Sequence, residues 1–341
     1  MHYSPPLPPP PSNTLFHIHF LPPFHHPLNL NSTTMDSTKN DVAFEFLPYF
    51  RAYKDGRVER FFGIDRVPPS TDSKTGVSSK DILITPETAV SARLFKPTTT
   101  NPPPQKLPLL IYFHGGAFCF GSPFCSTYHN HLTSLVAEAN VIALSVDYRL
   151  APEHPLPLAY EDSWAALKWV ASHSGRQGRE PWLNDTADFE RVFIAGDSAG
   201  ANIAHNTAVK AGVEAEELVG LKVVGICLVH PDFVGREGNV HKSWFFACPE
   251  TNGSGDPRIN PAVDLRLGRM GCRRVVVCVA EKDGMRERGW FYYETLKKCE
   301  WDGVVEIMEA KGEEHVFHLF DPTCENALAL LKKLASFINQ E

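Results

Sequence analysis

The pentapeptide Gly196-Asp197-Ser198-Ala199-Gly200 decides the fold of this 341-residue chain. It follows the apolar run 191–195, which favours a buried strand, and precedes 202–209, which favours a helix. A strand that enters a helix through Gly-x-Ser-x-Gly is a nucleophile elbow, because the small flanking residues allow a strained turn that exposes the serine hydroxyl. A glycine-rich turn without chemistry is the alternative for so short a motif, so the rest of the chain must support Ser198.

Composition and charge exclude several classes of function. The net charge is -7, the isoelectric point is near 6.1 and no basic stripe is present, which argues against nucleic acid as a partner. The eight cysteines form no C-x-x-C pair and several lie in apolar runs, as expected for free thiols in a reducing compartment. No apolar run reaches the roughly 18 residues of a membrane span. We therefore expect a cytoplasmic protein that binds small molecules, and leave its oligomeric state open.

Residues 1–34 differ from the remainder of the chain. They contain nine prolines, five histidines and no Asp, Glu, Lys or Arg before Met35. Such a stretch is expected to be disordered, and its histidines lack the fixed partners of a metal site. A secretory signal is disfavoured because His and Pro interrupt 15–24, whereas a plastid transit peptide remains the alternative. Translation from Met35 is the simpler explanation of this extension.

The aromatic-rich stretch at about 41–65 precedes the regular part of the chain. Apolar residues crowd together from Phe44 to Phe50, and we predict a short helix there. Asp55-Gly56 then predicts a turn between two strands, 50–53 and 58–62. We expect this segment to form a lid over a domain that occupies 35–341.

Eight apolar runs predict strands, and five helical stretches lie between the later ones. The strands are expected at 82–84, 91–95, 109–113, 141–146, 192–195, 223–229, 275–279 and 304–308, and the helices at 128–139, 159–171, 199–212, 286–299 and 326–338. Two strands that look antiparallel, followed by alternating strands and helices, predict a mostly parallel eight-stranded sheet with helices on both faces. The predicted fold class is α/β.

Reactive residues follow the strands in a definite order. Ser198 follows the fifth predicted strand, Asp283 follows the seventh and His315 follows the eighth, so all three belong at the carboxyl edge of the sheet. A serine hydroxyl needs a base to take its proton, and a histidine base needs a carboxylate to fix its tautomer. We predict this triad, with Glu281 as the second candidate for the acid and His318 as the alternative base.

The third predicted strand ends in His114-Gly115-Gly116-Ala117-Phe118. Its glycines would let the backbone approach a substrate, and preformed N–H donors stabilise the negative oxygen of a tetrahedral intermediate. We predict the amides of Gly115, Gly116 and Ala199 as these donors. A phosphate-binding loop is disfavoured, because neither G-x-G-x-x-G nor a P-loop motif is present. We expect no cofactor and no metal.

Taken together, these motifs resemble the plant carboxylesterase group of the hormone-sensitive-lipase-like α/β-hydrolases. The similar stretches are 46–48, 53–60, 114–118, 147–155, 196–200, Asp283 with Arg286, and 315–318. The resemblance covers about 41–338 and implies an α/β-hydrolase fold, with Ser198, His315 and Asp283 as the catalytic triad. It also implies a lid built from the N-terminal segment and from about 244–259.

Two positions depart from the group's pattern, and three activities occur on its scaffold. Ala117 stands where many relatives have a third glycine, and Glu287 stands where aspartate is common. The resemblance implies hydrolysis of small apolar or aromatic carboxylic esters. The alternative is a lyase similar to 2-hydroxyisoflavanone dehydratases or tuliposide-converting enzymes. A receptor similar to the gibberellin receptors is disfavoured, because those proteins lack the catalytic histidine and this chain has His315.

Overall fold

The computed structural model describes residues 41–98 and 106–340. The predicted disordered extension, the choice between Met1 and Met35 as the start, and most of the proline-rich loop before the third strand of the main sheet lie outside the described residues. The sheets and helices that position the candidate site all lie within them.

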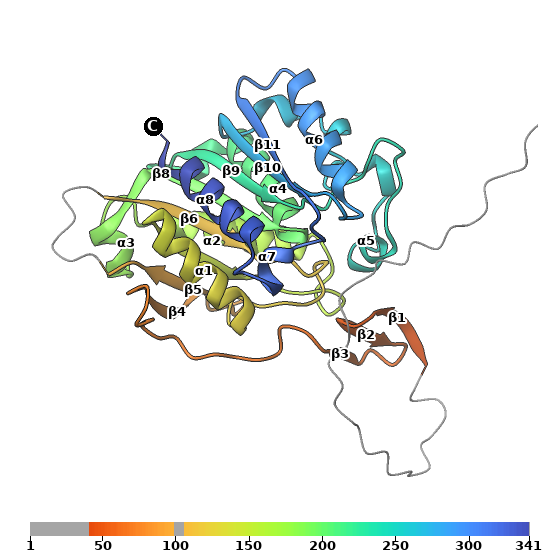
Figure 1. The fold of residues 1–341 in the computed structure, drawn as a ribbon, viewed down its shortest axis with the longest axis horizontal. Helices are drawn as coiled ribbons and strands as arrows, with labels where there is room; N and C mark the ends of the chain where they lie inside the picture. The colour runs from red at the N-terminus through yellow and green to blue at the C-terminus, as the bar shows by residue number, and fades with distance from the viewer. Residues whose placement is uncertain (1–40, 99–105, 341) are drawn as a thin grey trace, which may run out of the picture. The chain divides into compact units, whose positions relative to one another are not determined.

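The larger sheet has eight strands in the spatial order β11-β10-β9-β8-β6-β7-β5-β4 (Figure 1). Its strands are β4 (Ser78–Thr85), β5 (Val90–Lys96), β6 (Leu107–Phe113), β7 (Ile142–Asp147), β8 (Ala187–Asp197), β9 (Val223–Val229), β10 (Arg274–Ala280) and β11 (Val304–Ala310). The β4–β5 and β5–β7 pairs are antiparallel and all others are parallel. Each of the eight predicted runs overlaps one of these strands, which confirms the predicted mostly parallel sheet.

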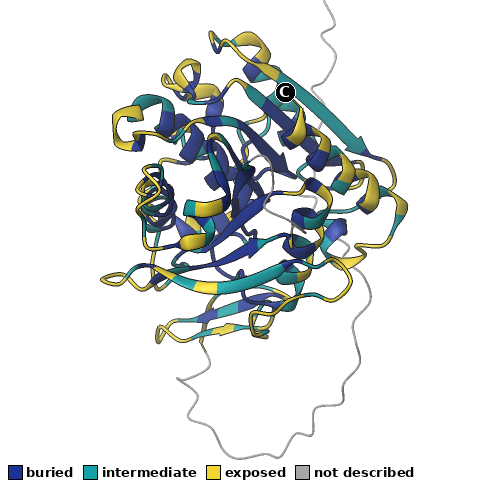
Figure 2. Cartoon of the chain, turned by 90° about the vertical axis from the view of Figure 1, so that its left-hand side faces the viewer, coloured by how far each residue is buried: buried dark blue, intermediate teal, exposed yellow. Residues whose placement is uncertain are grey.

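Helices cover both faces of the sheet because its central strands are apolar on both sides. In β6, Leu109, Ile111 and Phe113 belong to one core and Leu110 and Tyr112 to the other, as the two-residue period of a strand requires. One core also contains residues of α2 (Leu158–Ala171), α4 (Ala199–Val213) and α6 (Arg286–Lys298), and the other contains residues of α1 (Ser126–Ala139) and α8 (Glu325–Asn339). Figure 2 shows the central strands as a continuous buried layer.

All five predicted helices are present, and the described part of the chain contains three further short helices that were not predicted. The additional helices are α3 (Pro181–Thr186), α5 (Lys242–Ala247) and α7 (Phe317–Phe320), with 3₁₀ turns at Ala215–Leu218, Gly253–Gly255, Pro261–Val263 and Leu267–Arg269. Segments this short span less than two helical turns and show no clear 3.6-residue period in the sequence. Within the described residues, no helix has the length and apolarity needed to cross a membrane, and the eight cysteines form no disulfide.

The N-terminal stretch forms a separate antiparallel sheet of β1 (Val42–Phe46), β2 (Phe50–Tyr53) and β3 (Val58–Arg60). The predicted short helix is therefore wrong. Phe44 and Phe46 are half-buried while Glu45 between them is exposed, which is the alternation of a strand, and Pro48 stops a helix from continuing. The predicted hairpin at Asp55-Gly56 is confirmed, since Gly56 has a φ of 87° and closes the β2–β3 turn.

Aromatic rings and one arginine join the N-terminal sheet to the loop after β6. Phe120 in that loop stacks on Tyr49 with ring centroids 5.0 Å apart, and it also contacts Phe46, Phe50 and Phe62. The Arg60 guanidinium donates to the backbone oxygens of Cys119 and Ala151 and forms a bidentate pair with Glu153 at 2.7 and 2.8 Å. These contacts attach β1–β3 to the loops that follow β6 and β7.

Candidate active site

Ser198 occupies a strained turn between β8 and α4. Its φ of 52° and ψ of -118° lie in a region that side-chain-bearing residues seldom adopt, and such strain is typical of functional turns. The flanking glycines are required by close packing. A Cβ on Gly200 would overlap the carbonyl oxygen of Phe113 in β6, and one on Gly196 would overlap the backbone of Gly200. Glycine at both positions lets the chain approach β6 closely enough to form the elbow, because a larger residue would not fit.

Ser198, His315 and Asp283 form a continuous hydrogen-bonded relay. The Nε2 of His315 lies 3.0 Å from Ser198 Oγ, and its Nδ1 lies 2.8 Å from Asp283 Oδ2. An ionised carboxylate can only accept, so Nδ1–H donates to Asp283 and Nε2 accepts the serine hydroxyl proton. Asp283 follows β10 and His315 follows β11, which places both beside the elbow at the carboxyl edge of the sheet.

The competing candidates for acid and base do not reach the serine. Glu281 accepts the N–H of Gly312 at 2.8 Å and pairs with Lys311. His318 is buried at the start of α7, and neither of its ring nitrogens has a hydrogen-bond partner among the residues that the structure describes. The geometry therefore brings together Asp283 and His315 rather than these two.

Opposite charges set the protonation of the relay. Burial raises the pKa of Asp283, but the charge and hydrogen bond of His315 outweigh this effect and hold the pKa at about 2. Burial lowers the pKa of His315, but the carboxylates of Asp283, Asp197 and Asp232 outweigh that effect and raise it above its ordinary value. Asp283 is therefore ionised at neutral pH and favours a positive charge on His315.

The loop after β6 presents free amides beside the elbow. No hydrogen bond of the described residues uses the N–H groups of Gly116 and Ala117, and Ala199 begins α4, where a helical N–H has no internal acceptor. Gly116 has a φ of 116° and a Cβ there would overlap the carbonyl of Phe120. The N–H of Gly115 instead donates to Tyr128 Oη at 2.8 Å, so this predicted donor is already occupied.

A buried carboxylate links the elbow to this loop, and the sequence did not reveal it. Asp197 accepts the hydroxyls of Tyr112 and Tyr128, each at 2.8 Å, and Tyr128 is the residue that holds Gly115. Burial raises the pKa of Asp197 to about 6, although the two phenols oppose the shift. The signal in the sequence is a tyrosine, Tyr112, in an otherwise apolar strand.

A second histidine, His230, lies against the relay and was also not predicted. It follows β9, its side chain is 1% exposed, and its Nδ1 lies 3.9 Å from Asp283 Oδ2. His230, Asp283 and His315 are the one group of three within the described ranges whose atoms are close enough, at 4.8 Å, to hold a metal ion. Three of the four ring nitrogens are already bonded, because His230 Nδ1 accepts the Val316 N–H and both nitrogens of His315 belong to the relay, while His230 Nε2 is buried without a partner among the described residues. The nitrogens that face Asp283, Ser198 and Val316 therefore serve the relay and its loop.

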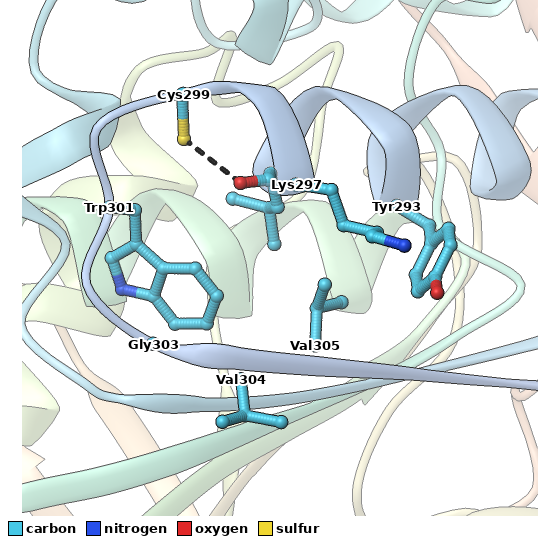
Figure 3. A pocket seen from close by; sticks show the side chains of 8 residues that line it. Tyr293, Lys297, Cys299, Trp301, Gly303, Val304 and Val305 are labelled. Carbon is cyan, nitrogen blue, oxygen red and sulfur yellow. Dashed lines mark hydrogen bonds between the residues drawn. The ribbon is translucent and has the colours of Figure 1, made fainter.

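A surface pocket of about 360 Å³ lies away from these residues (Figure 3). It is formed by the end of α6, the start of β11 and the connection between them, with Trp301, Lys297 and Cys299 on its wall. His315 follows the opposite, carboxyl end of β11, so the pocket and the relay lie at opposite ends of this strand.

Three comparisons identify the class of protein that this fold and relay define. A family model described as α/β hydrolase fold matches residues 110–319. A protein named probable carboxylesterase 2 from Arabidopsis thaliana is 49% identical over 90% of this chain and 99% of its own length. A 2-hydroxyisoflavanone dehydratase from Glycyrrhiza echinata is 44% identical over 90% of this chain and 99% of its own. The class is that of α/β-hydrolase-fold enzymes.

Solved structures agree with this class. The crystal structure of a thermophilic and thermostable carboxylesterase from a metagenomic library superposes with a TM-score of 0.63, at 27% identity, over 76% of this chain and 88% of that one. The chain belongs to the α/β-hydrolase family, in the group that includes the plant carboxylesterases and 2-hydroxyisoflavanone dehydratases.

Proposed function

We propose that this chain hydrolyses carboxylic esters, with Ser198 as nucleophile, His315 as general base and Asp283 as the acid that orients His315. The observation that carries the proposal is the relay itself, with 3.0 Å from Ser198 Oγ to His315 Nε2 and 2.8 Å from His315 Nδ1 to Asp283. A base within this distance activates a serine hydroxyl that is otherwise a poor nucleophile.

We assign each step of the proposed reaction to one of these groups. Ser198 Oγ bonds to the ester carbonyl carbon while its proton passes to His315 Nε2, and Asp283 stabilises the resulting imidazolium. When the tetrahedral intermediate collapses, the carbon–oxygen bond to the alcohol breaks and His315 returns the proton to that oxygen. Water, deprotonated by His315, then attacks the acyl-enzyme and releases the carboxylic acid and free Ser198.

The negative oxygen of the intermediate needs N–H donors that are not already used. Gly116 and Ala199 remain our proposed donors, and the free amide of Ala117 supports a third. Gly115 drops out of the proposed set, because its N–H is bonded to Tyr128.

Aromatic side chains near the elbow support a small apolar or aromatic substrate. Phe118, in the loop that carries the free amides, packs edge-on against Trp244 of α5 with centroids 5.7 Å apart. Phe44 of β1 stacks on Phe246 of α5 at 4.3 Å, which supports a lid formed jointly by the N-terminal sheet and the α5 region. Phe118 and Trp244 are themselves buried, whereas Phe44 and Phe246 are half-buried, so the second pair supports an apolar contact for a flat or apolar ligand.

Lyase chemistry on the same relay is the second candidate, because a dehydratase is 44% identical to this chain. In that reaction His315 would move a proton, and the free amides would stabilise a developing negative oxygen. Turnover of p-nitrophenyl esters of rising chain length, measured beside a 2-hydroxyisoflavanone, distinguishes the two activities. Ester turnover alone supports the hydrolase, and water elimination without ester turnover supports the lyase.

Ser198→Ala tests the nucleophile. We expect loss of short-chain aryl ester hydrolysis on the order of 10⁴-fold or more, and loss of covalent labelling by a fluorophosphonate probe. Ser145→Ala is the matched control, since the Ser145 hydroxyl is buried in β7 without a partner among the described residues. Retained hydrolysis or labelling in folded Ser198→Ala would refute the assignment.

A further inference from the structure

His230 occupies a strained position next to both partners of the catalytic histidine. Its φ of 48° lies in the left-handed region, and its N–H donates to the carbonyl of Cys278 in β10 at 2.7 Å. β9 pairs with β8 on one side and β10 on the other, so His230 lies between the elbow and the loop of Asp283. The strand order thus brings the His230 imidazole beside Asp283 and His315.

The side chain of His230 holds the residue that follows the base. Its Nδ1 accepts the N–H of Val316 at 2.7 Å. Val316 has a φ of 49°, which is costly for a β-branched residue and requires support from its surroundings. This bond supplies that support at the peptide adjoining His315, where a small rotation would move the imidazole away from Ser198.

The hydrogen bond also fixes the charge and tautomer of His230. An Nδ1 that accepts an N–H carries no proton, so the neutral ring has its proton on Nε2. Burial lowers the pKa of His230 to about 3 against the attraction of Asp283, and the other titratable rings facing it are His315 and His318. Because His230 is neutral, His315 is the histidine whose positive charge the Asp283 carboxylate stabilises.

We propose that His230 is a positioning residue for the relay: its Nδ1 fixes the His315-Val316 backbone so that His315 Nε2 stays within hydrogen-bonding distance of Ser198. Among the described residues, the His230 side chain forms no hydrogen bond to Ser198 or to the His315 ring. The inference rests on the proposed role of His315 and adds to it a residue that acts through the loop. A packing role alone would need only a ring of similar size.

Isosteric variants separate the two roles. The Oδ1 of His230→Asn lies near the place of Nδ1 and can accept the Val316 N–H, whereas His230→Gln places its oxygen near Nε2 and cannot. We expect the Gln variant to lose kcat on the order of 10²-fold with little change in KM, as for a small misplacement of a catalytic group, and the Asn variant to recover most of it. His230→Phe, which keeps the ring without an acceptor, should behave like the Gln variant.

His318→Phe is the matched control, because His318 is an equally buried neighbour whose nitrogens bond to nothing among the described residues. It should retain kcat. Equal activity of the Asn and Gln variants, or an equal loss in His318→Phe, would overturn the proposal.

A spectroscopic measurement keeps this test independent of turnover. The downfield NMR resonance of the His315 Nδ1 proton bound to Asp283 should persist in His230→Asn and broaden or disappear in His230→Gln. An unchanged resonance in the Gln variant would also overturn the proposal. If Ser198→Ala proved active, the proposed function would fail, while this resonance would still report on the loop.

Discussion

Two buried carboxylates, Asp283 and Asp197, act electrostatically on His315, and their own pKa values are shifted in opposite directions. Asp283 follows β10 and Asp197 ends β8, and both are almost fully enclosed. The pKa of Asp283 is held at about 2, whereas burial raises the pKa of Asp197 to about 6. The two residues differ in their partners more than in their depth.

Asp283 accepts from an imidazole that becomes a cation, and from the N–H of Met285 at 2.8 Å. Asp197 accepts from two phenols, which stay neutral. A neutral donor offsets only part of the cost of burying a charge, whereas a nearby cation can exceed it. The comparison separates a carboxylate that stabilises developing charge from one that joins the elbow to the loop after β6.

The largest difference between the two carboxylates is expected in catalysis. Asp283→Asn should lower kcat/KM on the order of 10⁴-fold, because the amide would favour the wrong tautomer of His315. Aryl ester hydrolysis measures this change. Glu281→Gln is the control, since Glu281 contacts Gly312 and Lys311 rather than His315, and it should stay within a few-fold of wild type. Comparable losses of kcat/KM in both variants would show that the assignment of Asp283 as the acid is wrong.

The next largest difference concerns the pH dependence of stability. An aspartate in the unfolded chain loses its proton near pH 4. Between about pH 4 and 6, folded Asp197 keeps a proton that the unfolded chain has lost, so its contribution to stability falls as the pH rises. Between about pH 2 and 4, the unfolded chain binds the extra proton instead of Asp283, so the contribution of Asp283 rises with pH.

Asp197→Asn should therefore gain stability relative to wild type as the pH rises from 4 to 7. The gain is on the order of 2–3 kcal/mol in the free energy of unfolding, measured by urea titration at each pH. The amide keeps both tyrosine contacts, since it can accept from Tyr128 and donate to Tyr112. A difference from wild type that is independent of pH would mean that Asp197 ionises normally in the fold.

The smallest effect should separate the two tyrosines. Tyr112→Phe removes one donor to Asp197, whereas Tyr128→Phe removes a donor to Asp197 and also the acceptor of the Gly115 N–H. We expect kcat to fall several-fold for Tyr128→Phe and to change little for Tyr112→Phe, because one hydrogen bond contributes about 1 kcal/mol. Aryl ester kinetics on the two variants measures this difference, and the reverse order would contradict the proposed link to the loop.

The sequence predicted what depends on local pattern and strand order. The apolar runs located every strand of the main sheet, and the positions of Ser198, Asp283 and His315 after their strands placed them at one edge. The sequence could not exclude Glu281 as the acid or His318 as the base, because the direction of a side chain within a short loop depends on tertiary packing. The strand at Val42–Phe46 was missed because its clustered apolar residues suggested a helix.

The supporting contacts could not be predicted, because they join residues far apart in the chain. Tyr128 and Asp197 are 69 positions apart, and His230 and Val316 are 86 apart. The occupied amide of Gly115 depends on the first of these pairs. Such contacts follow from the packing of α1 on the sheet and from the order of β8, β9 and β10, which become visible only in three dimensions.

The attachment of the N-terminal sheet limits how this enzyme can be recombined with its relatives. Phe120 packs among four rings contributed by residues 46–62, and Arg60 reaches across to Glu153. A chimera that exchanges only the first 65 residues would separate these partners. The segments suited to exchange are discontinuous in the sequence. They comprise β1–β3, the loop after β6 that contains Phe120, and the turn after β7 that contains Glu153.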